Sequence, residues 1–254
     1  MKSEFSLEGR VALVTGGARG IGRAIAGELV RQGAKLVIVD PGVNIAGGER
    51  DPALADNAAR ELGGVSLAQD IGAPGAAQAA VALAVKHYGA IDIVVNNAAT
   101  ALAFPIGEIT PEAFDKSFSV NVRGALLLTQ AALPQLTASP HASVVNVISV
   151  GAYSGAPGMG LYVAGKAALL SLTKTMAREL VGRGIRVNAL APGPFMTDMV
   201  TAGGDAQVQA FAASNPQQRV ADPSEIVEAA LFLASDASSF VTGTALTIDG
   251  GLSA

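Results

Sequence analysis

Short apolar runs and longer helix-type patterns alternate along the whole chain. The apolar runs lie at residues 11–15, 35–39, 65–69, 91–95, 143–148, 185–190 and 244–248, and most end at Gly, Asn, Asp or Ser. Continuous apolar runs bounded by turn residues are typical of strands that are buried on both faces. The helical patterns between them lie near 23–32, 53–62, 74–87, 111–136, 161–181 and 222–235. This alternation predicts an α/β fold with one parallel sheet of about seven strands and helices on both faces.

A glycine-rich turn follows the first strand. Gly16, Gly20 and Gly22 precede a helical pattern, and the second strand ends at Asp40. Glycines let the backbone approach a pyrophosphate, and the N-terminus of the next helix attracts its charge. The order predicts a doubly wound, Rossmann-type dinucleotide site that includes Gly16, Arg19, Gly20, Ile21 and Gly22. Because the spacing is Gly-x-x-x-Gly-x-Gly rather than Gly-x-Gly-x-x-Gly, a plain tight turn with a glycine-packed helix is the structural alternative.

Asp40 bears on the choice between NAD and NADP. It lies 18 residues after Gly22, where a carboxylate accepts hydrogen bonds from an adenosine ribose and repels a 2′-phosphate. Arg19 is a competing signal, because a cation beside the turn could bind a phosphate or could be a solvated turn residue. No Arg or Lys follows Asp40 directly. We therefore expect NAD as the cofactor, with NADP as the alternative.

Polar residues also end the third and fourth strands. Asp70 and Ile71 follow the third run. The Asp70 carboxylate and the next backbone amide could contact an adenine, or they could form a helix cap or a turn. Asn97 and Ala98 follow the fourth run, where Asn side chains tie neighbouring strand ends together or line a cofactor groove. Because parallel α/β sheets place their ligands outside the carboxyl ends of the strands, these residues belong to the same predicted site.

The fifth strand leads into the segment that carries the candidate chemistry. Ser149 ends this strand, and Tyr162 and Lys166 lie four residues apart on one face of the next helix. A nearby ammonium favours a phenolate, so the tyrosine pKa, ordinarily about 10, is expected to move toward neutrality. Such a tyrosine can exchange a proton with a substrate oxygen. A Tyr-x-x-x-Lys pair by itself is common by chance, and its structural alternative is a packed Tyr beside an exposed Lys. The other motifs of the chain make the catalytic interpretation stronger.

One polar residue and two long segments complete the predicted site. Asn121 interrupts apolar neighbours in the 111–136 helical pattern, so it is expected to face inward, either capping a kink or holding a water for proton transfer. Residues 41–52 are expected to form a long irregular loop near the adenosine end of the cofactor. Residues 194–220 are polar, contain Gly, Met and Phe, and suit a lid over a substrate pocket.

Composition narrows the classes of function. A chain of 254 residues without a polar linker predicts a single domain over 1–254, and the net charge of −4 gives no basic surface for nucleic acid. No apolar run approaches the roughly 18–20 residues that cross a bilayer. The chain has no cysteine and two histidines, which excludes disulfides and thiol catalysis and makes a metal site unexpected. We expect a soluble, cytoplasmic protein with neither nucleic-acid nor membrane partners.

Together these motifs resemble those of the short-chain dehydrogenase/reductase family, especially its 3-oxoacyl-carrier-protein reductase-like members, over residues 7–251. The resemblance implies that Tyr162 is the general acid/base and that Lys166 lowers its pKa and binds the nicotinamide ribose. It also implies that Ser149 bonds the substrate oxygen and that Asn121 holds a water in a proton relay. No metal is required.

The resemblance further implies that Pro192, Gly193 and Thr197 flank the nicotinamide. It implies a homotetramer in which the helices around 121–136 and 161–181 pack across subunits. Two departures stand out: Ala99 occupies a position that is usually glycine, and the stretch from Asp40 to Asp70 is longer than in many relatives.

The leading functional hypothesis is hydride transfer between nicotinamide and a secondary alcohol or ketone, with NAD(H) preferred. One alternative is an NADPH-dependent 3-oxoacyl thioester reductase, which Asp40 disfavours and Arg19 favours. Another is a non-catalytic dinucleotide-binding regulator, which the intact set of Asn121, Ser149, Tyr162 and Lys166 disfavours. The small and apolar residues expected in the pocket leave the substrate open.

Overall fold

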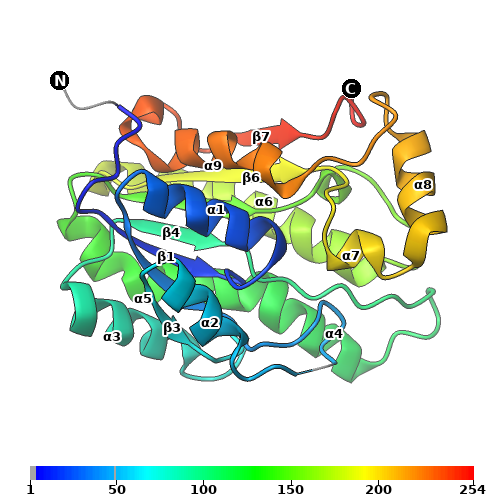
Figure 1. The fold of residues 1–254 in the computed structure, drawn as a ribbon, viewed down its shortest axis with the longest axis horizontal. Coiled ribbons are helices and arrows are strands. Elements are labelled where there is room, and N and C mark those ends of the chain that lie inside the picture. The colour runs from blue at the N-terminus through cyan, green and yellow to red at the C-terminus, as the bar shows by residue number, and fades with distance from the viewer. Residues whose placement is uncertain (1–3, 49) are drawn as a thin grey trace.

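The centre of the protein is a seven-stranded parallel sheet in the order β3-β2-β1-β4-β5-β6-β7 (Figure 1). The computed structural model describes residues 4–48 and 50–254. The strands are β1 (Val11–Thr15), β2 (Lys35–Val39), β3 (Val65–Leu67), β4 (Ile93–Asn96), β5 (Ser143–Val147), β6 (Arg186–Pro192) and β7 (Ala245–Ile248). The chain first builds outward from β1 to β3 and then returns to place β4 on the other side of β1. This reversal creates the switch point where α/β sheets place ligands.

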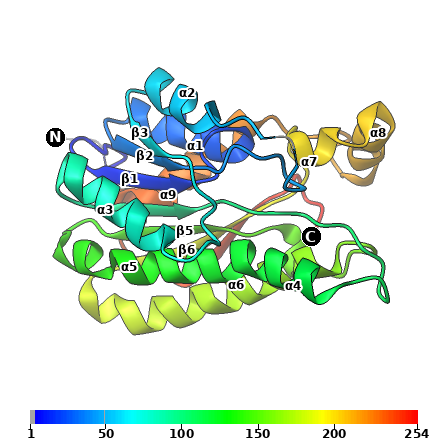
Figure 2. The same ribbon diagram turned by 90° about the horizontal axis from the view of Figure 1, so that it is seen from below.

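Helices cover both faces of the sheet, as the sequence predicts (Figure 2). Helices α1 (Gly20–Arg31), α2 (Leu54–Glu61) and α9 (Val227–Ala234) pack on one face, and α3 (Ala76–Tyr88), α5 (Ala125–Ala138) and α6 (Gly160–Leu180) pack on the other. In β2, Leu36 and Ile38 belong to the first core and Val37 to the second. Successive side chains of a strand point to opposite faces of the sheet, so each continuous apolar run contributes residues to both hydrophobic cores.

The helical pattern at 111–136 contains a break that the sequence did not predict. The structure has α4 (Pro111–Phe118), the π-helix η1 (Ser119–Gly124) and then α5. The Thr110 side chain accepts a hydrogen bond of 3.2 Å from the Ala113 amide and caps the start of α4. Asn121 lies within the π-helical turn, a feature that often marks functional sites.

The segment predicted to be a lid folds as two short helices, α7 (Asp198–Thr201) and α8 (Gly204–Ser214). The chain returns from them to the sheet edge, where Phe195 and Ala221 form an isolated parallel bridge. Short 3-10 turns join the remaining elements at Val150–Ala152, Val181–Arg183, Pro223–Ile226 and Asp236–Ser238. Across the described residues, no helix combines the length and apolar character needed to span a membrane.

Candidate active site

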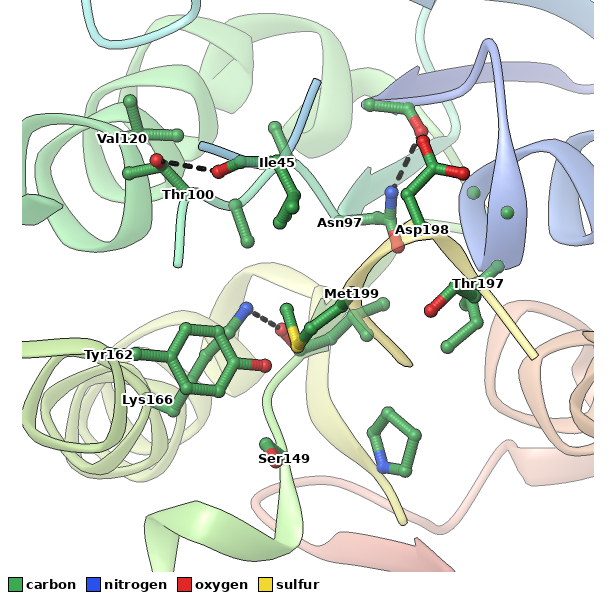
Figure 3. A pocket seen from close by; sticks show the side chains of 18 of the residues that line it. Ile45, Asn97, Thr100, Val120, Ser149, Tyr162, Lys166, Thr197, Asp198 and Met199 are labelled. Carbon is green, nitrogen blue, oxygen red and sulfur yellow. Dashed lines mark hydrogen bonds between the residues drawn. The ribbon is translucent and has the colours of Figure 1, made fainter. Parts of the chain in front are cut away.

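A cavity of about 360 Å³ opens at the carboxyl edge of the sheet (Figure 3). All residues predicted to contact the cofactor line it: Gly16, Arg19, Gly20, Ile21, Gly22, Asp40, Asp70, Ile71, Asn97, Ala98, Tyr162, Lys166, Pro192, Gly193 and Thr197. Ser149 lines it as well. Residues far apart in the sequence meet here because every strand of a parallel sheet ends at the same edge.

The glycine turn after β1 is closely packed. A Cβ atom at Gly22 would lie 2.1 Å from the Gly16 carbonyl oxygen, which no side chain tolerates. The Asn97 side chain donates hydrogen bonds of 3.0 Å to the Thr15 carbonyl and 2.9 Å to the Gly16 carbonyl. The turn therefore leads directly into the N-terminus of α1, where backbone N–H groups suit a pyrophosphate. Asn97 ties two strand ends together and also lines the cavity.

Asp40 is buried at the end of β2, with 4% of its surface exposed. Its carboxylate accepts hydrogen bonds from the Ala18 amide at 3.2 Å and the Gly42 amide at 2.9 Å. These bonds fix an acidic group beside the glycine turn. Each carboxylate oxygen can accept a further hydrogen bond, so Asp40 can still accept one from a ribose hydroxyl.

Arg19 pairs with Asp198 rather than standing free. Its Nη1 lies 3.0 Å from Asp198 Oδ2, and the ion pair joins the glycine turn to the start of α7. Both partners line the cavity. A phosphate that approached Arg19 would compete with a carboxylate already in place.

Asp70 also has a partner. Its Oδ1 accepts a hydrogen bond of 2.8 Å from the Gly72 amide, and its Oδ2 lies 2.5 Å from Lys116 Nζ. The turn and the ion pair agree with the structural alternative for Asp70, although the residue lines the cavity. Lys116 had no role in the sequence prediction, because nothing in the sequence of α4 indicates which strand end it reaches.

Tyr162 and Lys166 lie on one face of α6, with Lys166 Nζ 5.7 Å from the centre of the tyrosine ring. Lys166 is only 2% exposed, and its ammonium donates a hydrogen bond of 2.7 Å to the Val147 carbonyl. Burial raises the pKa of Tyr162 to about 12, and a hydrogen bond with Ser149 opposes that rise. Burial also lowers the pKa of Lys166 to about 8. The predicted shift of the tyrosine pKa toward neutrality is therefore wrong, because desolvation by burial outweighs the hydrogen bond with Ser149.

Asn121 does not line the cavity. It is 1% exposed, and its Oδ1 accepts a hydrogen bond of 2.9 Å from the Thr100 amide, while its Nδ2 donates one of 2.9 Å to the Thr100 carbonyl. A longer bond of 3.3 Å reaches the Ser117 hydroxyl. The Asn121 side chain thus clamps the segment that follows β4. The two predicted roles, capping a kink and holding a water, stay predictions.

Comparisons with known proteins agree with this geometry. A family model described as enoyl-(acyl carrier protein) reductase matches residues 16–253. The 3-oxoacyl-[acyl-carrier-protein] reductase FabG of Vibrio cholerae is 36% identical, with 98% of this chain and 99% of that protein aligned. The D-threitol dehydrogenase of Mycolicibacterium smegmatis is 35% identical over 98% of this chain and 94% of its own. A crystal structure from Sinorhizobium meliloti, of a proposed short-chain alcohol dehydrogenase, aligns with a TM-score of 0.88, 33% identity and 98% of both chains.

The chain belongs to the short-chain dehydrogenase/reductase family. Proteins of this family are oxidoreductases that use NAD or NADP, and this chain is an enzyme that transfers hydride between such a cofactor and an alcohol or ketone. The glycine turn and the buried carboxylate of Asp40 fit a dinucleotide, because both line the cavity and the turn leads into the N-terminus of α1. Within residues 4–48 and 50–254, no cluster of three or more His, Cys, Asp or Glu could hold a metal ion.

One residue that the sequence did not predict in this dehydrogenase/reductase site is Leu252, from the last turn of the chain. It lines the cavity together with Met159, Met199 and Phe211, which lies in the segment predicted to be a lid. Asp249 holds the C-terminal turn, because its carboxylate accepts hydrogen bonds from the Gly251 amide at 2.9 Å and the Ser253 amide at 2.8 Å. No local pattern predicts that the final residues return to the cavity.

Proposed function

We propose that the protein is an NAD(H)-dependent oxidoreductase of secondary alcohols and ketones whose substituents are uncharged and largely apolar. The observation that carries the NAD preference is the position of Asp40, a buried carboxylate beside the glycine turn. A carboxylate there accepts from a ribose hydroxyl and repels a 2′-phosphate. Arg19, the cation that would favour NADP, is engaged by Asp198.

The proposed mechanism assigns each catalytic step to a residue of this chain. When bound, a nicotinamide cofactor would supply the hydride chemistry. The glycine turn and the N-terminus of α1 would hold its pyrophosphate, and Lys166 would orient its nicotinamide ribose. Ser149 and Tyr162 bind the substrate oxygen, and Tyr162 transfers its proton. Asn121 supports this arrangement by holding the 100–101 segment in place.

Direction follows from the protonation of Tyr162. A phenol with a raised pKa is neutral near pH 7 and is ready to donate a proton as a ketone is reduced. Alcohol oxidation needs the opposite transfer, so the phenol must first release its proton. We therefore propose that the isolated enzyme reduces ketones readily at neutral pH and oxidises alcohols better at higher pH.

The substrate class is inferred from the cavity lining outside the predicted cofactor contacts. Apolar or small residues make up much of it: Val150, Gly151, Ala156, Met159, Val163, Pro194, Met199, Phe211 and Leu252. Of the cavity-lining cations, Arg19 and Lys116 are each paired with a carboxylate, and Lys166 bonds a carbonyl. Burying an unpaired carboxylate against methyl groups is costly, which favours neutral substrates.

Reduction of 3-oxoacyl thioesters with NADPH is the second candidate. It has the support of the 36% identity to a protein named for that reaction and of Arg19 beside the glycine turn.

We also propose a homotetramer, which agrees with the exposure of Phe114 at 45% and Leu127 at 38% on α4 and α5. Three further statements stay predictions from the sequence. They are the single domain over 1–254, the action of residues 194–220 as a lid, and the cytoplasmic location of the enzyme.

Titration of the purified protein with NADH and with NADPH, followed by cofactor fluorescence, tests the proposal. We expect NADH to bind more tightly than NADPH. We also expect Asp40→Ala to lower the preference for NAD, measured as kcat/KM with NAD divided by kcat/KM with NADP. Tighter binding of NADPH would move the thioester reductase to first place. Binding of neither cofactor would overturn the assignment of the cavity as a dinucleotide site.

A further inference from the structure

Residues 41–48, which we call the strap, cross one end of the cavity and reach the segment that follows β4. The strap leaves the end of β2 at Asp40, and its Ile45 reaches Thr100, which follows β4. In the sheet, β2 and β4 are the two neighbours of β1. A segment that joins their carboxyl ends must pass over the end of β1, where the glycine turn lies. Five strap residues line the cavity accordingly: Pro41, Val43, Asn44, Ile45 and Gly47.

The base and the tip of the strap are internally ordered. At its base, the Asp51 amide donates a hydrogen bond of 2.7 Å to the Gly42 carbonyl, and Val43 forms an antiparallel bridge with Arg50. At its tip, the Asn44 side chain accepts hydrogen bonds from the Ala46 amide at 3.2 Å and the Gly48 amide at 2.9 Å. The strap is therefore an internally bonded hairpin joined to β2 at its base, and contacts at its far side are a separate attachment.

Thr100 provides that attachment. Its hydroxyl donates a hydrogen bond of 2.9 Å to the Ile45 carbonyl (Figure 3). The Ala101 amide donates a second one of 3.1 Å to the same oxygen. Thr100 is 5% exposed, and both its backbone amide and its carbonyl are held by Asn121. The buried side-chain amide of Asn121 thus fixes the backbone of Thr100, the residue whose hydroxyl bonds the strap.

We propose that Thr100 is a positioning residue whose hydroxyl latches the strap over the bound dinucleotide, so that opening of this latch limits cofactor release. The inference rests on the proposed NAD(H) site. An exchanging cofactor has to pass between the strap and the glycine turn, and each hydrogen bond at Ile45 adds to the barrier for opening. The role is separate from the chemistry, because the Thr100 hydroxyl bonds the strap and its backbone alone bonds Asn121.

Thr100→Val tests the latch, because valine keeps the shape and removes the hydroxyl. Thr100→Ser keeps a hydroxyl, and Thr175→Val is a matched control on the exposed side of α6, where Thr175 bonds the Ser171 carbonyl. The readout is the NADH dissociation rate, measured by stopped-flow displacement. We expect Thr100→Val to release NADH roughly two- to tenfold faster, the change that loss of one neutral hydrogen bond allows. Thr100→Ser and Thr175→Val should stay within about twofold of the wild type.

A second variant and a second readout cover the case in which Thr100→Val folds poorly. Asn44→Ala removes the bonds that shape the strap tip without touching the core, and it should also speed NADH release. Amide hydrogen exchange of the cofactor-free proteins should rise in residues 42–48 for both Thr100→Val and Asn44→Ala. Unchanged release rates in both variants would overturn the latch while leaving the proposed function intact. Failure of the wild type to bind NADH or NADPH would instead overturn the proposed function.

Discussion

Lys166 and Tyr162 face one another across 5.7 Å, and burial moves the pKa of each away from its ordinary value in the direction that favours its uncharged form. The pKa of the tyrosine rises to about 12 and that of the lysine falls to about 8. Near pH 7 the phenol is neutral and the ammonium is still mostly charged. The pair therefore holds its transferable proton on Tyr162, with a cation close enough to stabilise the phenolate once the proton has left.

Tyr162→Phe should retain cofactor binding and lose turnover. Phenylalanine keeps the ring that packs near Lys166 and removes the only group of Tyr162 that can transfer a proton. We expect kcat to fall by roughly a hundred- to ten-thousandfold, the usual contribution of a general acid. NADH affinity, measured by fluorescence titration, should change little. Tyr88→Phe is the matched control, because Tyr88 bonds the Leu36 carbonyl away from the cavity; turnover by Tyr162→Phe equal to that control would remove the assigned acid role.

The two reaction directions should respond differently to pH. Below a tyrosine pKa of about 12, the phenolate fraction rises about tenfold per pH unit, so kcat/KM for alcohol oxidation should climb from pH 6 to 8. Above about pH 8 the rise should flatten, because Lys166 loses the charge that supports the phenolate. Ketone reduction should stay nearly level over pH 6–8, since the phenol remains protonated.

Initial rates in both directions, with saturating cofactor in a constant-ionic-strength buffer, check this asymmetry. A reduction rate that falls between pH 6 and 8 would contradict the raised pKa of Tyr162. It would indicate that the working tyrosine titrates near neutrality, as the sequence alone suggests.

Asp198→Asn should shift cofactor preference toward NADP. The exposed pair of Arg19 and Asp198 contributes little to stability, about 0.2–1 kcal/mol, so the fold should be unaffected. Releasing Arg19 makes a cation available to a 2′-phosphate, and NADPH affinity should rise about two- to fivefold relative to NADH. Asp205→Asn removes the same charge from α8 and is the control. An equal gain in both variants would show that net charge, rather than Arg19, is responsible.

Gly22→Ala should damage both the turn and cofactor binding. The added Cβ would lie 2.1 Å from the Gly16 carbonyl oxygen and 2.3 Å from Asn97 Nδ2, so the backbone must move. We expect a loss of about 1–3 kcal/mol in the free energy of unfolding, typical of overpacking, and at least a tenfold loss of NADH affinity. Gly27→Ala on the same helix is the control, because its Cβ would meet nothing closer than 3.8 Å and should be tolerated. Urea unfolding and NADH titration of both variants separate the two effects.

The sequence by itself determined the architecture and the edge at which the chemistry gathers. Apolar runs and helical periods are local signals, and parallel strands can end only at a common edge, so the residues after each strand had to approach one another. For that reason the strand-end positions of Gly16, Asp40 and Ser149, with Tyr162 on the helix that follows, are enough to assign these residues to one cavity.

Tertiary structure alone decided the partners and the electrostatics. Arg19 meets Asp198 from 179 residues away, Thr100 fastens a strap that reads as an irregular loop, and a π-helical turn surrounds Asn121. The pKa of Tyr162 rises because the packed cavity removes water, a quantity that depends on every surrounding element. Local sequence carries the pattern of each segment, whereas pairing and desolvation arise only when distant segments are brought together.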